Sequence, residues 1–299
     1  METLTYTEKT FIIKEDFKIA AKTWGNPNGK PILALHGWLD NANTFDKIAA
    51  HLHQDLYLVA IDLPGHGLSD HKKSNSSYYL WEYAIQVLNL IDVLKWKTFS
   101  IIAHSLGTGI ASIIAGSFPE KLTNLVCIDG LGAPFITNED QTVINFRKAV
   151  RQSKMADKTN FISFNDTNTA QFESEEEAIQ DRIKNNHVGQ ISIEASKILC
   201  KRSLKKEASG YAWRYDPRVM LLKPFRLTEN QAKLFIKSIK CTTLLILGEE
   251  GMFGFGLFND RIQEFQFATV HWLPGGHHLH LEEASEKITL LINQFLNKN

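Results

Sequence analysis

The chain has 299 residues, of which 43% are hydrophobic and 22% charged, a composition typical of globular enzymes. Its 33 basic residues balance its 33 acidic residues, so no overall field attracts nucleic acid, and the charge argues against a nucleic-acid-binding protein. No apolar run reaches the roughly 18 residues that a membrane span requires.

The amino-terminal residues predict antiparallel edge strands. Residues 5–13 and 17–24 mix β-branched and aromatic residues with polar ones, and the turn-forming segment 26–30 follows them. The pattern then changes to short, nearly continuous apolar runs, which are typical of parallel strands buried on both faces. These runs are PILALH (31–36), LYLVAID (56–62), FSIIAH (99–104), LVCID (125–129) and TLLILG (243–248), with a further strand at 267–273.

Helical spacing of apolar residues occurs between these runs. It is found at 44–53, 78–95 and 106–118, and Pro119 ends the third helix. A helical stretch near 257–264 and an amphipathic helix at 279–297 complete the chain. The alternation of strands and helices predicts an α/β fold with a mostly parallel sheet.

The alternation stops between about 135 and 237, where the sequence is more polar and has helical periodicity without strand-like runs. This stretch is longer than an ordinary connecting loop. We therefore predict a helical cap of residues 135–237, inserted into an α/β core formed by residues 1–134 and 238–299. The acidic run ESEEEAIQDRIKNN (173–186) is expected to be the solvated face of a cap helix.

Cysteine content and the amino terminus bear on the compartment. Cys127, Cys200 and Cys241 are too few and too far apart for a disulfide framework or a cysteine metal site. The first residues lack a basic start followed by an apolar stretch, so no secretory signal is expected. We expect a protein of the reduced cytoplasm.

The segment FSIIAHSLGTG (99–109) predicts a nucleophilic serine. A buried strand runs directly into Ser105 and a helix of small residues follows, as in the nucleophile elbow G-x-S-x-G, which exposes the serine hydroxyl above the sheet. The residues two before and two after the serine pack against neighbouring backbone, and here they are Ala103 and Gly107. Ala103 departs from the pattern by one methyl group, which is a mild steric change.

Together with this elbow, three further segments resemble the α/β-hydrolase family. HGWLDN (36–41) is similar to its oxyanion loop, DLPGHGLSD (62–70) to its D-x-x-G-x-G-x-S turn, and PGGHHLHLEEA (274–284) to the segment that carries its histidine. The segments HGWLDNANTFD, GHGLSDH, YYLWEY and LKWKTFSIIAHSLG resemble the subgroup of serine hydrolase-like proteins. The resemblance implies an α/β-hydrolase fold whose cap is inserted after the strand that ends near Asp129.

A serine hydroxyl is a weak nucleophile and needs a base within hydrogen-bond reach. His277 is the predicted base, because it follows two glycines after a strand and the family pattern places its histidine there. His278 and His280 are expected to be structural. The resemblance implies that His36 and His66 pack around the oxyanion loop.

Two places for the acid that orients the base fit the sequence. The family usually has an aspartate in the loop after the next-to-last strand, but Gly251 stands there. We favour Asp129, at the strand end where haloalkane dehalogenases place their acid, because the role needs only a buried carboxylate beside the histidine Nδ1. Glu249 or Glu250 is the alternative acid, and Asp260 is a more distant one.

The backbone N–H groups of Leu106 and Trp38 are expected to form the oxyanion hole, as the resemblance implies. The Trp38 indole either favours an apolar acyl group or packs under the cap. Substrate choice is expected to depend on the cap, including residues 210–218, and on the aromatic stretch 252–258, which suggest a mostly apolar pocket.

The predicted function is a carboxylesterase-like serine hydrolase, which cleaves an ester or related acyl bond of a small to medium, mostly apolar substrate through an acyl-serine intermediate. Thioesterase and carbon–carbon bond hydrolase activities use the same triad and remain alternatives. A different class of alternative is a non-catalytic ligand-binding protein on a hydrolase scaffold, which only Gly251 supports. No metal, organic cofactor or partner other than a small-molecule substrate is implied.

Overall fold

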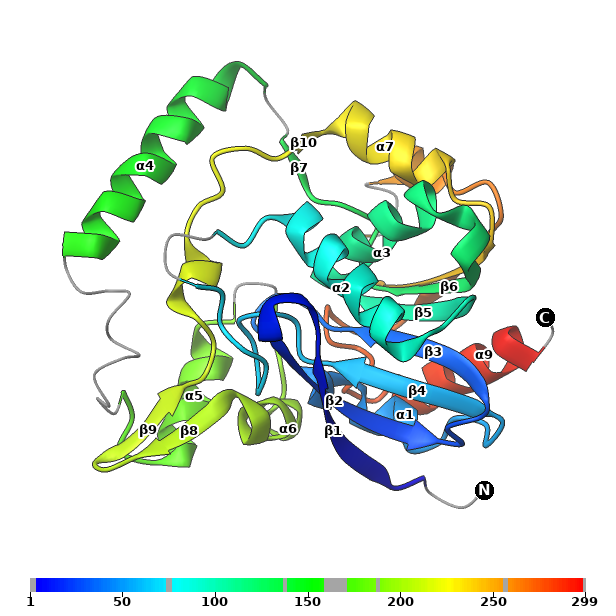
Figure 1. Cartoon of the computed structure of the whole chain (residues 1–299), viewed down its shortest axis with the longest axis horizontal. Helices are drawn as coiled ribbons and strands as arrows, with labels where there is room; N and C mark the ends of the chain where they lie inside the picture. Colours follow the sequence, from blue (N-terminus) through cyan, green and yellow to red (C-terminus); the bar gives the residue numbers. More distant parts are fainter. Residues whose placement is uncertain are drawn as a thin grey trace.

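A computed structural model of the chain describes residues 4–73, 77–136, 139–158, 171–186, 189–254 and 258–297. An eight-stranded sheet crosses the molecule in the order β1-β2-β4-β3-β5-β6-β11-β12 (Figure 1). Strands β1 and β2 pair antiparallel, as do β2 and β4, and the remaining neighbours are parallel. The bounds are β1 Tyr6–Ile12, β2 Lys18–Gly25, β3 Lys30–Leu35, β4 Leu56–Ile61, β5 Phe99–His104, β6 Leu122–Ile128, β11 Thr242–Gly248 and β12 Ala268–Leu273.

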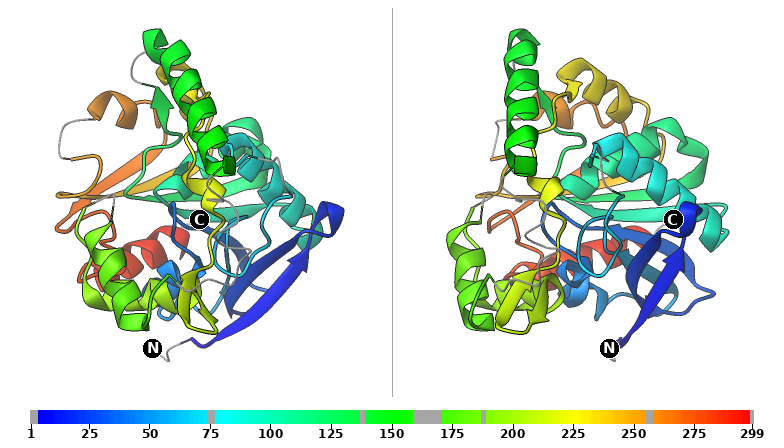
Figure 2. Two further views of the ribbon diagram at one scale, coloured as in Figure 1. Left: turned by 90° about the vertical axis from the view of Figure 1, so that its left-hand side faces the viewer. Right: turned by 60° about the vertical axis from the view of Figure 1, so that its left-hand side comes forward.

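Helices cover both faces of this sheet (Figures 1 and 2). In β3, Leu33 and Leu35 enter the core beneath one helical layer, whereas Ile32 and Ala34 enter the core beneath the other. Successive side chains of a strand point to opposite faces, so a strand buried on both faces is apolar at every position. This confirms the predicted α/β fold. The first layer contains α2 (Leu80–Leu94), α3 (Leu106–Ser117) and α7 (Glu229–Lys237), and the second contains α1 (Asp46–Ala49) and α9 (Ser285–Asn297).

Three predicted helices are shorter than the sequence pattern indicated. The stretch 44–53 overlaps the end of a 3₁₀ turn, η2 (Ala42–Phe45), and contains only the single turn of α1. Near 257–264, the helix α8 spans Asn259–Ile262. The helix predicted to start at 279 begins at Ser285, because the preceding residues form turns that bury Leu279 and Leu281. Apolar spacing marked buried residues correctly there, but tertiary packing buries them without a helix.

The segment between β6 and β11 contains α4 (Thr142–Lys158), α5 (Glu175–Lys184), α6 (Ile193–Ser203) and the 3₁₀ helix η6 (Pro217–Met220). The prediction that it has no strands was wrong. Strands β8 (Leu204–Glu207) and β9 (Gly210–Trp213) form a hairpin, and β7 (Phe135–Ile136) pairs with β10 (Leu227–Thr228). Strands of two to four residues are too short to display a recognisable alternation. The exact division into core and cap stays a prediction.

Two ion pairs with buried carboxylates hold this segment against the sheet. Arg182 of α5 donates to Asp40 at 2.5 Å and to the Leu39 carbonyl at 2.8 Å, which fixes the loop after β3. Arg202 of α6 donates to both carboxylate oxygens of Asp62, at 3.0 and 2.7 Å. Removing one partner of a buried ion pair leaves the other charge unpaired and destabilises a protein by about 3–5 kcal/mol. These contacts therefore fix the segment over the sheet.

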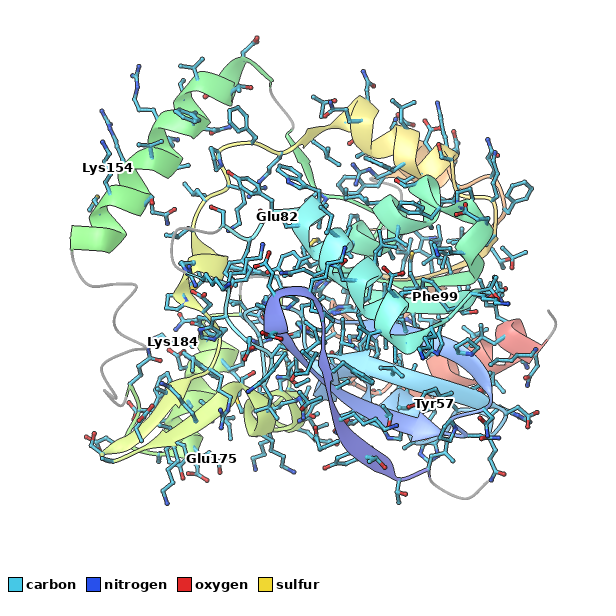
Figure 3. All side chains as sticks on the ribbon, in the orientation of Figure 1. Tyr57, Glu82, Phe99, Lys154, Glu175 and Lys184 are labelled. Atoms are coloured by element: carbon cyan, nitrogen blue, oxygen red, sulfur yellow. The ribbon has the colours of Figure 1, made fainter. Side chains whose placement is uncertain are left out.

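Exposed charged side chains cover the outer parts of the segment, as predicted for residues 173–186. Lys154, Glu175 and Lys184 point outward from their helices, whereas Phe99 lies inside the body of the molecule (Figure 3). Among the helices of the described residues, none is long and apolar enough to cross a membrane. Cys127, Cys200 and Cys241 are buried free thiols.

Candidate active site

Ser105 occupies a strained turn between β5 and α3. Its backbone has φ 49° and ψ −115°, a conformation that an L-residue adopts only where the surrounding structure enforces it. A side chain at Gly107 would collide with the Leu35 backbone, whose carbonyl carbon would lie 2.7 Å from an added Cβ. Ala103 is fully buried within β5. The tight turn thus explains why the residue two positions after the serine is glycine, and the structure accommodates the methyl group of Ala103.

Asp129 and His277 form a buried pair. The Nδ1 atom of His277 lies 2.5 Å from Oδ2 of Asp129, and both side chains are buried. The backbone N–H groups of Gly248 and Met252 donate to the two oxygens of this carboxylate, at 3.1 and 2.9 Å. A carboxylate that already accepts two backbone hydrogen bonds is held rigidly, so it can fix the orientation of the imidazole.

Gly251 leaves the space that Asp129 occupies. A Cβ atom at residue 251 would overlap the Asp129 carboxylate, coming within 2.7 Å of Cγ and 2.8 Å of Oδ2. Glycine at position 251 therefore leaves room for the Asp129 carboxylate, which approaches the same point from the end of β6. Glu249, Glu250 and Asp260 are exposed, and the structure does not bring them to His277.

Ser105 and His277 lie at the same edge of the sheet. His104, which directly precedes the serine, has its ring centroid 4.6 Å from that of His277, and its Nε2 donates to the His277 carbonyl at 2.9 Å. No hydrogen bond joins the Ser105 hydroxyl to His277 among the described residues. Such bonds are often long in unliganded sites and shorten when substrate binds. Because its Nε2 donates to the His277 carbonyl, His104 positions the backbone of His277 rather than acting as a base.

The electrostatic surroundings keep His277 neutral. Burial lowers the pKa of His277 to about 4, and the neighbouring His104 and His278 act in the same direction, although the hydrogen bond to Asp129 opposes them. A neutral imidazole whose Nδ1–H points at a carboxylate carries its lone pair on Nε2, which is the atom that a general base uses.

Asp40, His104 and His278 form a buried cluster behind His277. Asp40 Oδ2 lies 3.4 Å from Nδ1 of His104 and 3.3 Å from Nε2 of His278, and one ligand atom from each residue lies within 4.8 Å of the others, a spacing that metal sites also show. Arg182 already pairs with the same carboxylate. Burial alone would raise the pKa of Asp40, but the two histidines and Arg182 hold it well below its usual range. We interpret the cluster as an ion-pair network, because the guanidinium would repel a cation.

His36, His66 and His280 each have a hydrogen-bonding partner outside the catalytic pair. Nε2 of His36 accepts from the Leu63 backbone at 2.8 Å, and Nδ1 of His66 lies 3.1 Å from the Pro64 carbonyl. Nε2 of His280 lies 2.7 Å from the Thr44 hydroxyl. All three rings are buried.

The predicted oxyanion residues border the serine. Leu106 is the first residue of α3, so its N–H lies among the helix-terminal donors that have no partner within the helix. Trp38 lines the same cavity as Ser105 and Leu106, and its indole Nε1 donates to the Val219 carbonyl at 3.2 Å. The indole thus packs beneath the segment between β6 and β11. The two backbone donors stay a prediction.

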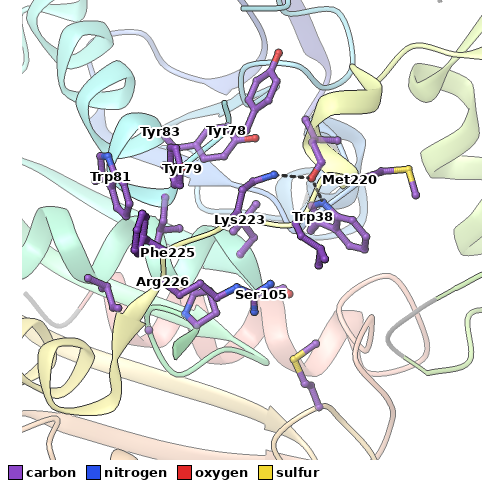
Figure 4. A pocket seen from close by; sticks show the side chains of 18 of the residues that line it. Trp38, Tyr78, Tyr79, Trp81, Tyr83, Ser105, Met220, Lys223, Phe225 and Arg226 are labelled. Carbon is purple, nitrogen blue, oxygen red and sulfur yellow. Dashed lines mark hydrogen bonds between the residues drawn. The ribbon is translucent and has the colours of Figure 1, made fainter. Parts of the chain in front are cut away.

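A cavity of about 580 Å³ opens above Ser105 (Figure 4). Most of its lining is apolar or aromatic, from α2, η6 and the chain that follows η6. Met252, Phe253 and Phe258 contribute from the aromatic stretch, of which residues 255–257 lie outside the described residues. Residues 210–218 are not among the described lining residues, and a role for them in substrate choice stays a prediction.

Several lining residues were missed by the sequence reasoning. Lys223 and Arg226 line the cavity from the loop after η6, Tyr78 from just before α2, and Tyr83 from the first turn of α2. The aromatic pattern of residues 78–83 was a usable signal, but no periodicity marks Lys223 or Arg226.

Comparisons with known proteins agree with this architecture. A family model described as the alpha/beta hydrolase fold matches residues 30–190. The chain is 37% identical over 282 residues to a serine hydrolase-like protein of Dictyostelium discoideum, covering 89% of this chain and 75% of that protein. It is 30% identical over 287 residues to a serine hydrolase-like protein of Danio rerio, covering 93% and 85%. The crystal structure of a hypothetical protein from Pseudomonas aeruginosa PAO1 superposes with a TM-score of 0.84 at 34% identity, covering 98% of this chain and 99% of that one.

Proposed function

The chain belongs to the α/β-hydrolase family, and from that premise we propose that it is a serine hydrolase with Ser105 as nucleophile, His277 as base and Asp129 as acid. One observation carries the proposal. The Asp129–His277 pair, with its 2.5 Å contact, is buried at the sheet edge where the strained Ser105 turn opens into an apolar cavity. Nucleophile, base and orienting acid are the three groups that acyl transfer requires.

In the proposed mechanism, the Ser105 hydroxyl attacks a substrate carbonyl and passes its proton to His277. The Asp129 carboxylate stabilises the imidazolium, and the N–H groups of Leu106 and Trp38 bind the developing oxyanion. His277 then protonates the departing alcohol, which leaves an acyl-serine. Water, deprotonated by His277, attacks the acyl-serine and releases the acid.

Ester hydrolysis is the reaction that we propose for this site. The cavity is lined mainly by apolar and aromatic side chains, which suit a small to medium acyl or aryl group. A non-catalytic binding protein was the alternative because of Gly251. The position of Asp129 removes that argument, since the carboxylate approaches His277 from another strand.

Labelling by a fluorophosphonate, followed by intact-mass measurement, tests the proposal. Wild type should gain one label, because an activated serine attacks the phosphorus and keeps it covalently bound. The Ser105→Ala variant should gain none, while its circular dichroism spectrum matches that of wild type. A folded wild-type protein that never becomes labelled would sink the proposal.

The pH dependence of hydrolysis should follow the low pKa of His277. Because burial lowers this pKa from 6.5 to about 4, the imidazole stays neutral, and so competent as a base, well into the acidic range. The kcat/KM for a neutral p-nitrophenyl ester should hold from about pH 8 to about pH 6 and fall only below that. Circular dichroism at each pH separates this fall from acid unfolding. A midpoint at or above the ordinary histidine value in folded protein would contradict the burial argument.

A further inference from the structure

The charged groups around the cavity do not balance. Three cations near it have carboxylate partners: Lys72 pairs with Glu82 at 2.7 Å, Arg218 with Asp216 at 2.5 Å, and Arg261 with Glu229 at 2.7 Å. Lys223 and Arg226, which both line the cavity, pair with no carboxylate among the described residues. None of the described lining residues is acidic. The cavity therefore holds two positive charges that no carboxylate of the described residues neutralises.

The Lys223 ammonium is held beside Trp38. Its Nζ donates to the carbonyls of Leu221 at 2.6 Å, of Val219 at 3.3 Å and of Arg218 at 3.3 Å. The Val219 oxygen also accepts from the Trp38 indole (Figure 4). Neutral carbonyls satisfy its donors but do not cancel its charge. Burial lowers the pKa of Lys223 to about 8, and the positive charges of Arg226 and Lys72 act in the same direction against Asp216 and Glu82.

We propose that the substrate carries a carboxylate at the end of its acyl group away from the scissile bond, and that Lys223 and Arg226 bind this carboxylate while Ser105 attacks the ester carbonyl. The proposal rests on the serine hydrolase function proposed above. An anion in this position supplies the missing counter-charge, and the apolar walls accommodate the chain between its two ends. The substrate class is thus a monoester of a dicarboxylic acid whose two carboxyl groups are joined by an apolar chain.

Matched esters test this subsite. The p-nitrophenyl monoester of suberic acid bears a free carboxylate, whereas its methyl ester has the same chain without the charge. Wild type should prefer the charged ester in kcat/KM by about 10–100-fold, the range expected for a hydrogen bond between charged groups in a partly buried site. Lys223→Met and Arg226→Gln should each reduce this ratio. Lys223→Arg should retain most of it, and Lys206→Met, which removes an exposed lysine of β8, should leave the ratio unchanged. Equal rates for the two esters in wild type would overturn the proposal.

A binding measurement separates failure of the subsite from failure of the catalytic proposal. Isothermal titration of Ser105→Ala with suberic acid monoanilide, and with the methyl ester of that compound, reports binding without turnover. The charged compound should bind at least about tenfold more tightly, and this preference should fall as pH rises through about 8, where Lys223 loses its proton. If wild type hydrolyses neither ester yet this preference is found and is lost in Lys223→Met, the subsite stands and the hydrolase proposal fails. If the two compounds bind equally, the subsite is absent.

Discussion

The Asp129→Asn variant should fold as wild type does and hydrolyse a p-nitrophenyl ester about 10⁴-fold more slowly in kcat. An asparagine that presents its amide NH₂ group to Nδ1 of His277 donates a hydrogen bond there, whereas the carboxylate accepted one. It therefore favours the tautomer whose Nε2 carries the proton, and that nitrogen can no longer act as a base. Steady-state kinetics measure the loss, and thermal unfolding checks that the variant is folded.

The alternative acids provide the matched control. Glu249 and Glu250 are exposed, so a Glu249→Gln/Glu250→Gln double variant should keep nearly all of the activity. A large loss in this variant, with little loss in Asp129→Asn, would move the acid to the loop after β11 and contradict the 2.5 Å pair in the structure.

The α/β architecture was predictable from sequence because the central strands are buried on both faces. Such strands are apolar at every position, and this pattern survives without any knowledge of their neighbours. The short strands β7 to β10 give no comparable signal. The start of α9 was misplaced because Leu279 and Leu281 are buried in turns rather than in a helix.

The candidate site shows a similar division. Ser105 and His277 stand in local patterns, and Asp129 was favoured because it stands at a strand end where a buried carboxylate can lie beside the histidine. The reason for Gly251 was not predictable, since it depends on a side chain more than a hundred residues earlier in the chain. Lys223 and Arg226 were missed because an uncompensated charge becomes visible only when every neighbouring ion pair is known.

Residue 251 provides the strictest test of how the acid is placed. Gly251→Ala should lower kcat by about 10²-fold or more and destabilise the protein by about 1–3 kcal/mol, because the added methyl group overlaps the Asp129 carboxylate and displaces it from His277. Ester kinetics and urea unfolding measure the two effects. Gly276→Ala is the matched control: it adds a methyl group directly before His277, but the nearest atoms to that group are 3.9 Å away. It should change both quantities far less.

The same geometry predicts that the acid can be moved. A Cβ at residue 251 would lie 2.8 Å from Oδ2 of Asp129 and closer still to Oδ1, and these two distances bracket the separation of Cβ and a carboxylate oxygen within one aspartate. An aspartate at 251 can thus present an oxygen near the point that His277 contacts, provided that the side chain at 129 is removed.

Asp129→Gly should be nearly inactive, and Asp129→Gly/Gly251→Asp should recover at least about tenfold in kcat, since an acid beside Nδ1 restores the tautomer. Gly251→Asp alone should be less active than Gly251→Ala, because two carboxylates would compete for one space. Failure of the double variant to exceed Asp129→Gly, in folded protein, would mean that the backbone hydrogen bonds from Gly248 and Met252 fix the acid to β6 and that the carboxylate oxygen alone is not sufficient.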